Sequence, residues 1–231
     1  MVMVKGFNSF KEWFEGYENQ YVIIGGTACD ILMNDLNIDF RATKDIDLVL
    51  IVESLTPEFG ARFWEYVKAA GYEHRNRSTG AVQFYRFQNP SSPSYPVMIE
   101  LFSKKPDTLV LPPDAILTPL PIDEEISSLS AILLDDAYYN FLQAGAIVMD
   151  GVSLLDTAYI IPFKAKAWLD LSDRKAKGEQ VDSKNIRKHK NDVLRLFDTL
   201  PESTRISLPE PIYKDMQKFV ESIAQEPIIL K

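Results

Sequence analysis

Two aspartates separated by a single residue are the part of this sequence best suited to chemistry. Asp45 and Asp47 open the segment 45–52, a predicted buried strand because its later residues are apolar on both faces. Residues i and i+2 of a strand point to the same face, so the two carboxylates project together. Their repulsion favours a cation between them, and paired carboxylate oxygens suit Mg²⁺ or Mn²⁺. Alternatively, the aspartates only flank the start of a strand on an acidic protein.

A Gly-Gly pair lies upstream, at a predicted junction between strand and helix. The apolar segment 21–24 is a predicted strand, and it leads into Gly25 and Gly26. Thr27 is then predicted to cap a helix that runs to about Asn34. Glycines let a backbone approach phosphates closely, and a helix N-terminus favours the anion. Gly-Gly alone is typical of a tight turn, but this order of elements together with the Asp-x-Asp strand indicates a phosphate site beside a metal site.

The two motifs together resemble the core of a known family. These are the minimal nucleotidyltransferases of the polymerase-β superfamily related to bacterial abortive-infection and toxin–antitoxin toxins (AbiEii-type). The family core is Gly-Gly-Thr-Ala, a helix, and then Arg-x-Thr-x-Asp-x-Asp-Leu, and residues 25–28 and 41–48 match every fixed position. The resemblance covers only the first quarter of the chain. It implies a polymerase-β-type fold that binds a nucleoside triphosphate with Mg²⁺ and transfers the nucleotidyl group.

The family usually supplies a third carboxylate from a later strand, and Glu100 is the candidate here. It is the one acid in the predicted strand 97–103, and burying an unpaired charge is costly. The resemblance therefore implies that Asp45, Asp47 and Glu100 bind the metal and form the catalytic set. Two alternatives stay open for Glu100: an edge-strand side chain facing solvent, or a structural pair with an arginine such as Arg86. Many relatives have aspartate at this position.

Two lysines in the second half of the chain fall on predicted inward faces. Lys164 lies on the apolar face of the predicted helix 162–177, and Lys190 lies in the apolar stripe of the predicted helix 183–200. That second stripe consists of Ile186, Val193, Leu194 and Phe197. An inward lysine must find an anion or extend its ammonium group to solvent. Both lysines are candidate triphosphate ligands, and Arg41 is either a phosphate contact or a salt-bridge partner.

Composition limits the class of protein. The 231 residues carry a formal net charge of −8, and no apolar run approaches the ~20 residues that span a bilayer. The basic and then apolar order of a signal peptide is missing, so a cytoplasmic location is expected. General DNA binding is not expected, because affinity for a nucleic-acid backbone depends on basic side chains.

Three single residues have expectations of their own. The one cysteine, Cys29, has apolar neighbours and is expected to be a buried small residue rather than a reactive thiol. His74 and His189 have no companions at metal-ligand spacing, and both are expected at the surface.

Helices and strands mix in the first half, and helices dominate the second. Helices are predicted at 9–17, 27–34, 57–70, 132–142, 162–177, 183–200 and 209–224, and strands at 21–24, 45–52, 72–77, 81–88, 97–103, 146–149 and 152–155. The proline-rich segment 109–123 is a predicted connection between a nucleotidyltransferase-like core (1–108) and a mainly helical domain (124–231). The predicted class is α+β: a polymerase-β-type mixed sheet with helices, followed by a mainly helical region.

The predicted function is Mg²⁺-dependent transfer of a nucleoside monophosphate from a nucleoside triphosphate to an acceptor. The acceptor stays open between an RNA, a protein and a small molecule. Three alternatives also stay open: a degenerate relative that binds nucleotide without chemistry, a toxin-like protein masked by an antitoxin partner, and a plain metal- or protein-binding module.

Overall fold

One mixed β-sheet lies at the centre of the computed structural model, which describes residues 4–73, 85–104, 117–119 and 130–225. The helices are α1 (Phe7–Phe14), α2 (Gly25–Asp35), α3 (Pro57–Ala70), α4 (Asp136–Ala144), α5 (Thr157–Ala176), α6 (Ser183–Phe197) and α7 (Glu210–Ala224). The strands are β1 (Tyr21–Ile24), β2 (Asp45–Leu50), β3 (Arg86–Gln88), β4 (Met98–Ser103), β5 (Leu117–Pro119), β6 (Ser130–Leu133), β7 (Ala146–Met149) and β8 (Val152–Leu155).

Strand β2 lies in the middle of the sheet, whose order is β5-β6-β4-β2-β1-β8-β7, with β3 also paired to β4. It runs antiparallel to β1 and parallel to β4. The register places Asp47 opposite Ile24 on one side and opposite Glu100 on the other. Arg86 of β3 is in turn opposite Glu100. The start of β2, the end of β1 and the N-terminus of α2 therefore meet at the same end of the central strands.

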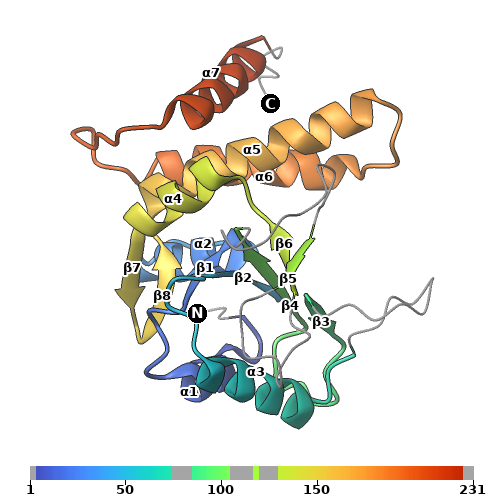
Figure 1. Cartoon of the computed structure of the whole chain (residues 1–231). Coiled ribbons are helices and arrows are strands. Elements are labelled where there is room, and N and C mark those ends of the chain that lie inside the picture. Colours follow the sequence, from blue (N-terminus) through green and yellow to red (C-terminus); the bar gives the residue numbers. More distant parts are fainter. Residues whose placement is uncertain (1–3, 74–84, 105–116, 120–129, 226–231) are drawn as a thin grey trace.

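The two faces of the sheet differ in polarity because side chains alternate along a strand. Ile46 and Leu48 of β2 and Ile99 and Leu101 of β4 are fully buried on one face. Helices α1 and α3 cover that face with aromatic rings, and Phe63 of α3 packs edge-on against Phe87 of β3. The opposite face has half-buried residues at alternate positions of both strands. Helices α2 and α5 lie on this second face (Figure 1).

Acidic residues begin three helices of the later part. The carboxylates of Asp135, Asp156 and Asp182 accept hydrogen bonds from the first-turn backbone N–H groups of α4, α5 and α6. Helix α5 packs against α6, α7 and α2 and so forms the centre of the helical layer. None of the described helices is long and apolar enough to cross a membrane.

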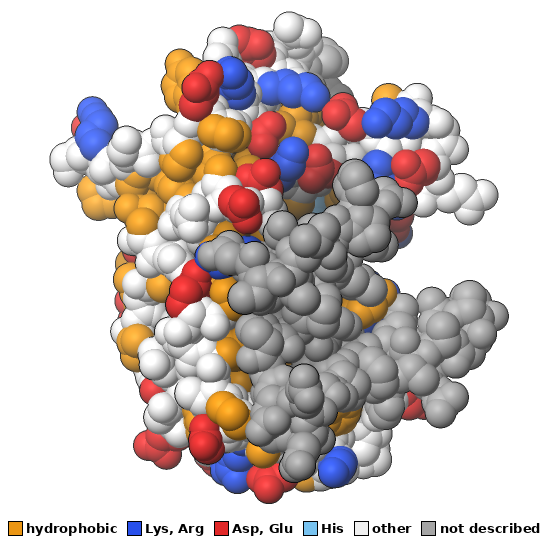
Figure 2. Space-filling model, viewed as in Figure 1, with side chains coloured by type: hydrophobic (Ala, Val, Ile, Leu, Met, Phe, Trp, Pro, Cys, Tyr) orange, Lys and Arg blue, Asp and Glu red, His pale blue; other side chains and the backbone are white. Residues whose placement is uncertain are grey.

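A second, smaller apolar cluster attaches the last helix. Tyr138 and Phe141 of α4 pack with Ile212 of α7, apart from the main core. Figure 2 shows hydrophobic side chains gathered on this part of the viewed face, between charged side chains of the helices. Helix α7 is therefore held by this cluster and by its packing on α5, where its buried Phe219 joins the main core and meets Trp168 edge-on.

The predicted α+β class, a mixed sheet with helices, is confirmed. Several boundaries were wrong. Residues 132 and 133 belong to strand β6, and helix α4 starts only at Asp136, because Asp135 caps it. Helix α5 starts at Thr157, so Pro162 lies inside it rather than in its first turn. Helix α1 covers Phe7–Phe14 instead of 9–17.

The predicted division of the chain at 109–123 stays a prediction, since only 117–119 of that segment lies within the described residues. The sheet itself takes strands from both sides of it: β6 pairs with β4, and β8 pairs with β1. The predicted strands 72–77 and 81–88 lie largely outside the described residues. What is described there is β3 and a bridge between Glu73 and Gln88.

Replacing Phe14 by alanine tests the aromatic face. Its fully buried ring contacts Phe10, Tyr21 and Phe63, among others. We expect Phe14→Ala to lower the free energy of unfolding by about 3–5 kcal/mol because a cavity replaces the ring. Phe197→Ala is the matched control, since that ring is 66% exposed, and its effect should stay within about 0.5 kcal/mol. Urea denaturation measures both, and equal losses would contradict the assigned core.

Candidate functional site

The carboxylate of Asp47 lies against the first residue of α2. Gly25 has a φ of 73°, in the left-handed region that favours glycine, and a Cβ there would collide with Oδ2 of Asp47. A Cβ on Gly26 would lie 2.9 Å from Oγ1 of Thr43 and 3.3 Å from Nη2 of Arg41. Both glycines thus form the first turn of α2, and each allows a close approach by the chain that leads into β2.

The prediction that Thr27 caps α2 was wrong. The N-cap residue is Ile24, which makes no side-chain cap hydrogen bond, and Thr27 is the third residue of the helix. Its fully buried hydroxyl donates a 2.6 Å hydrogen bond to the backbone carbonyl of Asp45. Cys29 is buried, as expected, and its thiol donates to the carbonyl oxygen of Gly25 at 3.0 Å. The hydroxyl of Thr27 therefore links β2 to α2, and the predicted role of Thr27 in phosphate binding stays a prediction.

Acidic groups crowd around Asp47. Burial raises the pKa of Asp47 to about 7, and the nearby negative charges of Glu100 and Asp45 add to the effect. The ammonium group of Lys164 opposes this shift. Burial also raises the pKa of Asp45, with the positive charge of Lys188 opposing it most strongly. Carboxylates that repel one another in a partly desolvated place would be stabilised by a cation, so Asp45 and Asp47 fit the donor set of a hard metal ion.

Glu100 lies beside Asp47 but is paired with an arginine. Both Nε and Nη2 of Arg86 contact Oε1 of Glu100 at 2.5 Å, and the glutamate side chain is 13% exposed. This is the structural pair that the sequence left open as an alternative. Within the described residues, no group of three or more acidic, histidine or cysteine side chains is arranged to hold a metal ion. The three-carboxylate set of Asp45, Asp47 and Glu100 stays a prediction.

A buried ion cluster joins the helical layer to the sheet. Asp192 of α6, which is 1% exposed, accepts hydrogen bonds from Nε and Nη2 of Arg41 at 3.0 and 2.7 Å. It also accepts one from Nζ of Lys164 on α5 at 2.9 Å. These partners hold the pKa of Asp192 below its ordinary value despite its burial. Lys164 is inward, as predicted, and Arg41 forms the salt bridge that the sequence left open.

The inward face of α6 differs from the predicted one. Leu194 and Phe197, which belonged to the predicted stripe, are 46% and 66% exposed. The buried residues are Asp192, Val193 and Leu196. On this face Asp192 reaches two cations on other elements, and Val193 and Leu196 pack beside it. Lys190 is half-buried and is not among the residues that line the cavity described below, so its role as a triphosphate ligand stays a prediction.

Sequence reasoning missed Lys188. This half-buried residue interacts electrostatically with Asp45 and Asp47, and burial and the charges of Arg41 and Lys164 lower its pKa. Its spacing to Asp192, four residues on one helix, places both on the same face. That spacing was the only indication in the sequence that Lys188 faces inward. It could not be used, because the sequence did not show that Asp192 is buried.

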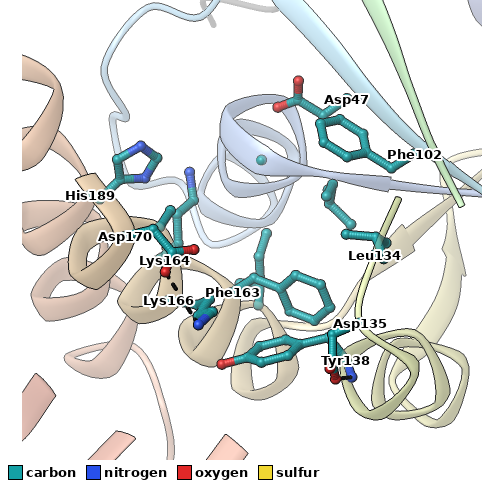
Figure 3. Close-up of a pocket in the computed structure, with 14 residues that line it drawn as sticks. Asp47, Phe102, Leu134, Asp135, Tyr138, Phe163, Lys164, Lys166, Asp170 and His189 are labelled. Carbon is teal, nitrogen blue, oxygen red and sulfur yellow. Dashed lines mark hydrogen bonds and ion pairs between the residues drawn. The ribbon is translucent and has the colours of Figure 1, made fainter. Parts of the chain in front are cut away.

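A cavity of about 430 Å³ opens between the sheet and α5. Figure 3 shows Asp47 and Phe102 on one side and Lys164 and His189 on the other, with the ring of Phe163 lower in the view, near Tyr138. Gly25 and several further apolar side chains also line it. The cavity therefore has a polar part beside Asp47 and Lys164 and an apolar part beside the aromatic rings.

His189 lies in the wall of this cavity and not at the surface, so its expected place was wrong. Its Nδ1 is buried and has no hydrogen-bond partner among the described residues. Burial, and then the positive charges of Lys164 and Lys188, lower the pKa of His189 to about 4. The side chain is therefore neutral at physiological pH. His74 lies outside the described residues.

No family model matches the sequence, and no curated protein matches it. Among solved structures, the chain is similar to the crystal structure of the Megavirus polyadenylate synthase, with 10% sequence identity and a TM-score of 0.34. The match covers 95% of this chain and 41% of that chain, so this chain spans about two fifths of that protein's length. A similarity of this strength carries no conclusion about activity, and membership of the AbiEii-type family stays a prediction.

The raised pKa of Asp47 predicts how stability depends on pH. The native state keeps a proton on Asp47 up to about pH 7, whereas the unfolded chain releases it near pH 4. This contribution is therefore present below the unfolded pKa and is lost as pH rises through 7. In metal-free buffer, Asp47→Asn should be about 2–4 kcal/mol more stable than the wild type at pH 8 and about equal to it at pH 4. Denaturant unfolding at both pH values measures this, and a difference independent of pH would contradict it.

Breaking the buried ion cluster should destabilise the fold. We expect Asp192→Asn to cost about 3–5 kcal/mol, because Lys164 would be left charged and buried without its partner. Arg41 contributes less, since its side chain is 27% exposed and reaches solvent. The double variant Asp192→Asn/Lys164→Met should therefore recover part of the loss. Thermal and urea unfolding measure both, and a double variant less stable than Asp192→Asn alone would count against the cluster as described.

Proposed function

We propose that this protein is a metal-dependent nucleotidyltransferase that moves a nucleoside monophosphate from a nucleoside triphosphate to an acceptor. One observation carries the proposal. The carboxylate of Asp47, the Gly25 end of α2 and the ammonium group of Lys164 come from three separate elements and face a single cavity. Carboxylates, a helix N-terminus and a lysine are together the groups that bind a metal ion and phosphates.

The cavity suits a whole nucleotide. Its volume of about 430 Å³ lies within the range of small-molecule sites. The N-cap residue Ile24 makes no side-chain cap hydrogen bond, and Gly25, the first residue of α2, lines the cavity, so this helix end is the proposed contact for phosphate oxygens. Lys164 lines the cavity and adds positive charge for the β- and γ-phosphates, and Lys188 adds to the positive potential although it is not among the lining residues. The rings of Phe102 and Phe163 offer an apolar surface on which a base can stack.

The proposed reaction is an in-line displacement at the α-phosphorus. A bond forms from the acceptor oxygen to the α-phosphorus, the bond from the α-phosphorus to the bridging oxygen breaks, and pyrophosphate leaves. Asp45 and Asp47 would hold Mg²⁺ or Mn²⁺, which supplies neutralising charge for the phosphates. Glu100 lies next to Asp47 in the register and is the proposed acceptor of the proton from the attacking hydroxyl. Its pairing with Arg86 through Oε1 would orient the carboxylate.

A second candidate is a degenerate relative that binds a nucleotide without transferring it. The Arg86–Glu100 pair favours it, because a carboxylate neutralised by arginine is a weaker metal ligand and base. A toxin-like role, with an antitoxin protein as partner, is supported only by the sequence resemblance. Its test is growth arrest on expression, relieved by a neighbouring gene product.

Calorimetry and a transfer assay test the proposal. We expect a nucleoside triphosphate to bind the wild type with Mg²⁺, and Asp45→Asn/Asp47→Asn to weaken that binding by about tenfold or more. Label from an α-phosphate-labelled triphosphate should pass to a component of a cell extract, with transfer falling about 10²-fold or more in the variant. The matched control is Asp35→Asn/Asp39→Asn, which changes the charge equally at two exposed positions.

The outcomes separate the candidates. Metal-dependent binding together with transfer supports the nucleotidyltransferase. Binding without transfer to any component of the extract favours the degenerate relative. Well-folded wild type that binds none of the triphosphates, with or without Mg²⁺, would exclude both and leave an interaction module.

A further inference from the structure

The surroundings of His189 carry an excess of positive charge. The charged groups that act on its imidazole are Lys164 of α5, Lys188 and Asp192 of α6, and Arg41 from the segment before β2. Three of these are cations, and the one carboxylate, Asp192, already accepts hydrogen bonds from two of them.

The cavity wall also holds the carboxylates of Asp47 and Asp170 and the ammonium group of Lys166, which forms an ion pair with Asp170. Among the groups that act on the imidazole the cations outnumber the carboxylates, and cations in a partly buried place repel one another, so this part of the cavity favours an anion.

His189 itself is incompletely satisfied. Its Nδ1 is buried without a partner among the described residues, and the side chain forms part of the cavity wall. Buried polar atoms are nearly always hydrogen-bonded, so this nitrogen needs a partner, and a ligand in the cavity can supply one. In Figure 3 the imidazole and the side chain of Lys164 lie on the same side of the cavity, so a ligand held by the lysine would approach the histidine.

A bound polyphosphate would reverse the electrostatics at the imidazole. In the free protein, burial and the cations keep His189 neutral, with its pKa lowered to about 4. A triphosphate beside Lys164 brings several negative charges, which favour the protonated imidazole. Protonation converts both ring nitrogens to donors, so that Nδ1 can donate to a phosphate oxygen.

We propose that His189 takes up a proton from solvent when the triphosphate binds and, once protonated, positions the pyrophosphate group beside Lys164. This inference rests on the proposed function, because it places the phosphates in the same cavity. It assigns His189 as a positioning residue and makes the affinity for polyphosphate depend on pH. Binding should weaken as pH rises, because the proton that stabilises the complex becomes scarcer.

Proton uptake is measured by calorimetric titration with inorganic triphosphate, which carries the charge without a base. The protein is titrated at pH 6.5 in buffers of different ionisation enthalpy. We expect the wild type to take up about half a proton or more beyond the uptake of His189→Asn. The subtraction removes the protons that belong to triphosphate itself. His74→Asn is the control, since His74 is the chain's other histidine, and it should behave as the wild type.

The pH dependence gives a second comparison. Between pH 6 and pH 8, the affinity of the wild type should fall more steeply than that of His189→Asn, the difference approaching at most about tenfold per pH unit. Equal slopes and equal uptake would overturn the proposal while leaving the nucleotide site intact. If inorganic triphosphate and every nucleoside triphosphate fail to bind the wild type, the proposed function itself fails.

Nuclear magnetic resonance makes the test independent of the variant's folding. The chain has 2 histidines, so His74→Asn identifies the imidazole signals of His189. In the wild type, these signals should indicate a neutral ring down to about pH 5 and should titrate near neutral pH once triphosphate is added. Signals of a bound complex that still indicate a neutral ring at pH 6 would overturn the proposal.

Discussion

The buried carboxylate of Asp192 is the constraint on which the rest of the structure depends. It lies on α6, and its partners, Lys164 and Arg41, come from α5 and from the segment that leads into β2. A charge that is 1% exposed must keep its partners, because an unpaired ion in a protein interior is strongly unfavourable. The helical layer is therefore tied to the sheet at one defined position. The cavity lies beside this joint, and Lys164 belongs to both.

The second constraint is the close packing at the start of α2. Asp47 can lie where it does only because Gly25 has no side chain and adopts a positive φ. The hydroxyl of Thr27 holds the backbone of Asp45 to the same helix. As a result, two carboxylates are held beside Glu100, although like charges repel. Burial and the neighbouring carboxylates favour the protonated form of Asp47, and a bound cation would favour the ionised form instead.

Charge is unevenly distributed around the cavity. Asp47 lies on the sheet side beside Asp45 and Glu100, and Lys164 lines the helix side, where Asp170 and Lys166 form an ion pair. Under the proposed function, the metal ion would lie beside Asp47 and the phosphates beside Lys164, on two different layers of the fold. The net charge of −8 gives no hint of this arrangement, because it sums over the whole chain.

The sequence by itself determined the features that depend on neighbours along the chain. The alternation of β2, the paired carboxylates of Asp45 and Asp47, and the glycines before them follow from local geometry. Only the tertiary structure decided which face of α6 points inward, since Asp192 meets Arg41 across 151 positions of the chain. Lys188 and His189 also lie far along the chain from Asp47, so the sequence did not show that they are near it. Apolar periodicity identifies a buried face only where the buried side chains are apolar. On α6 the buried face includes the charged side chain of Asp192, and Phe197 is exposed.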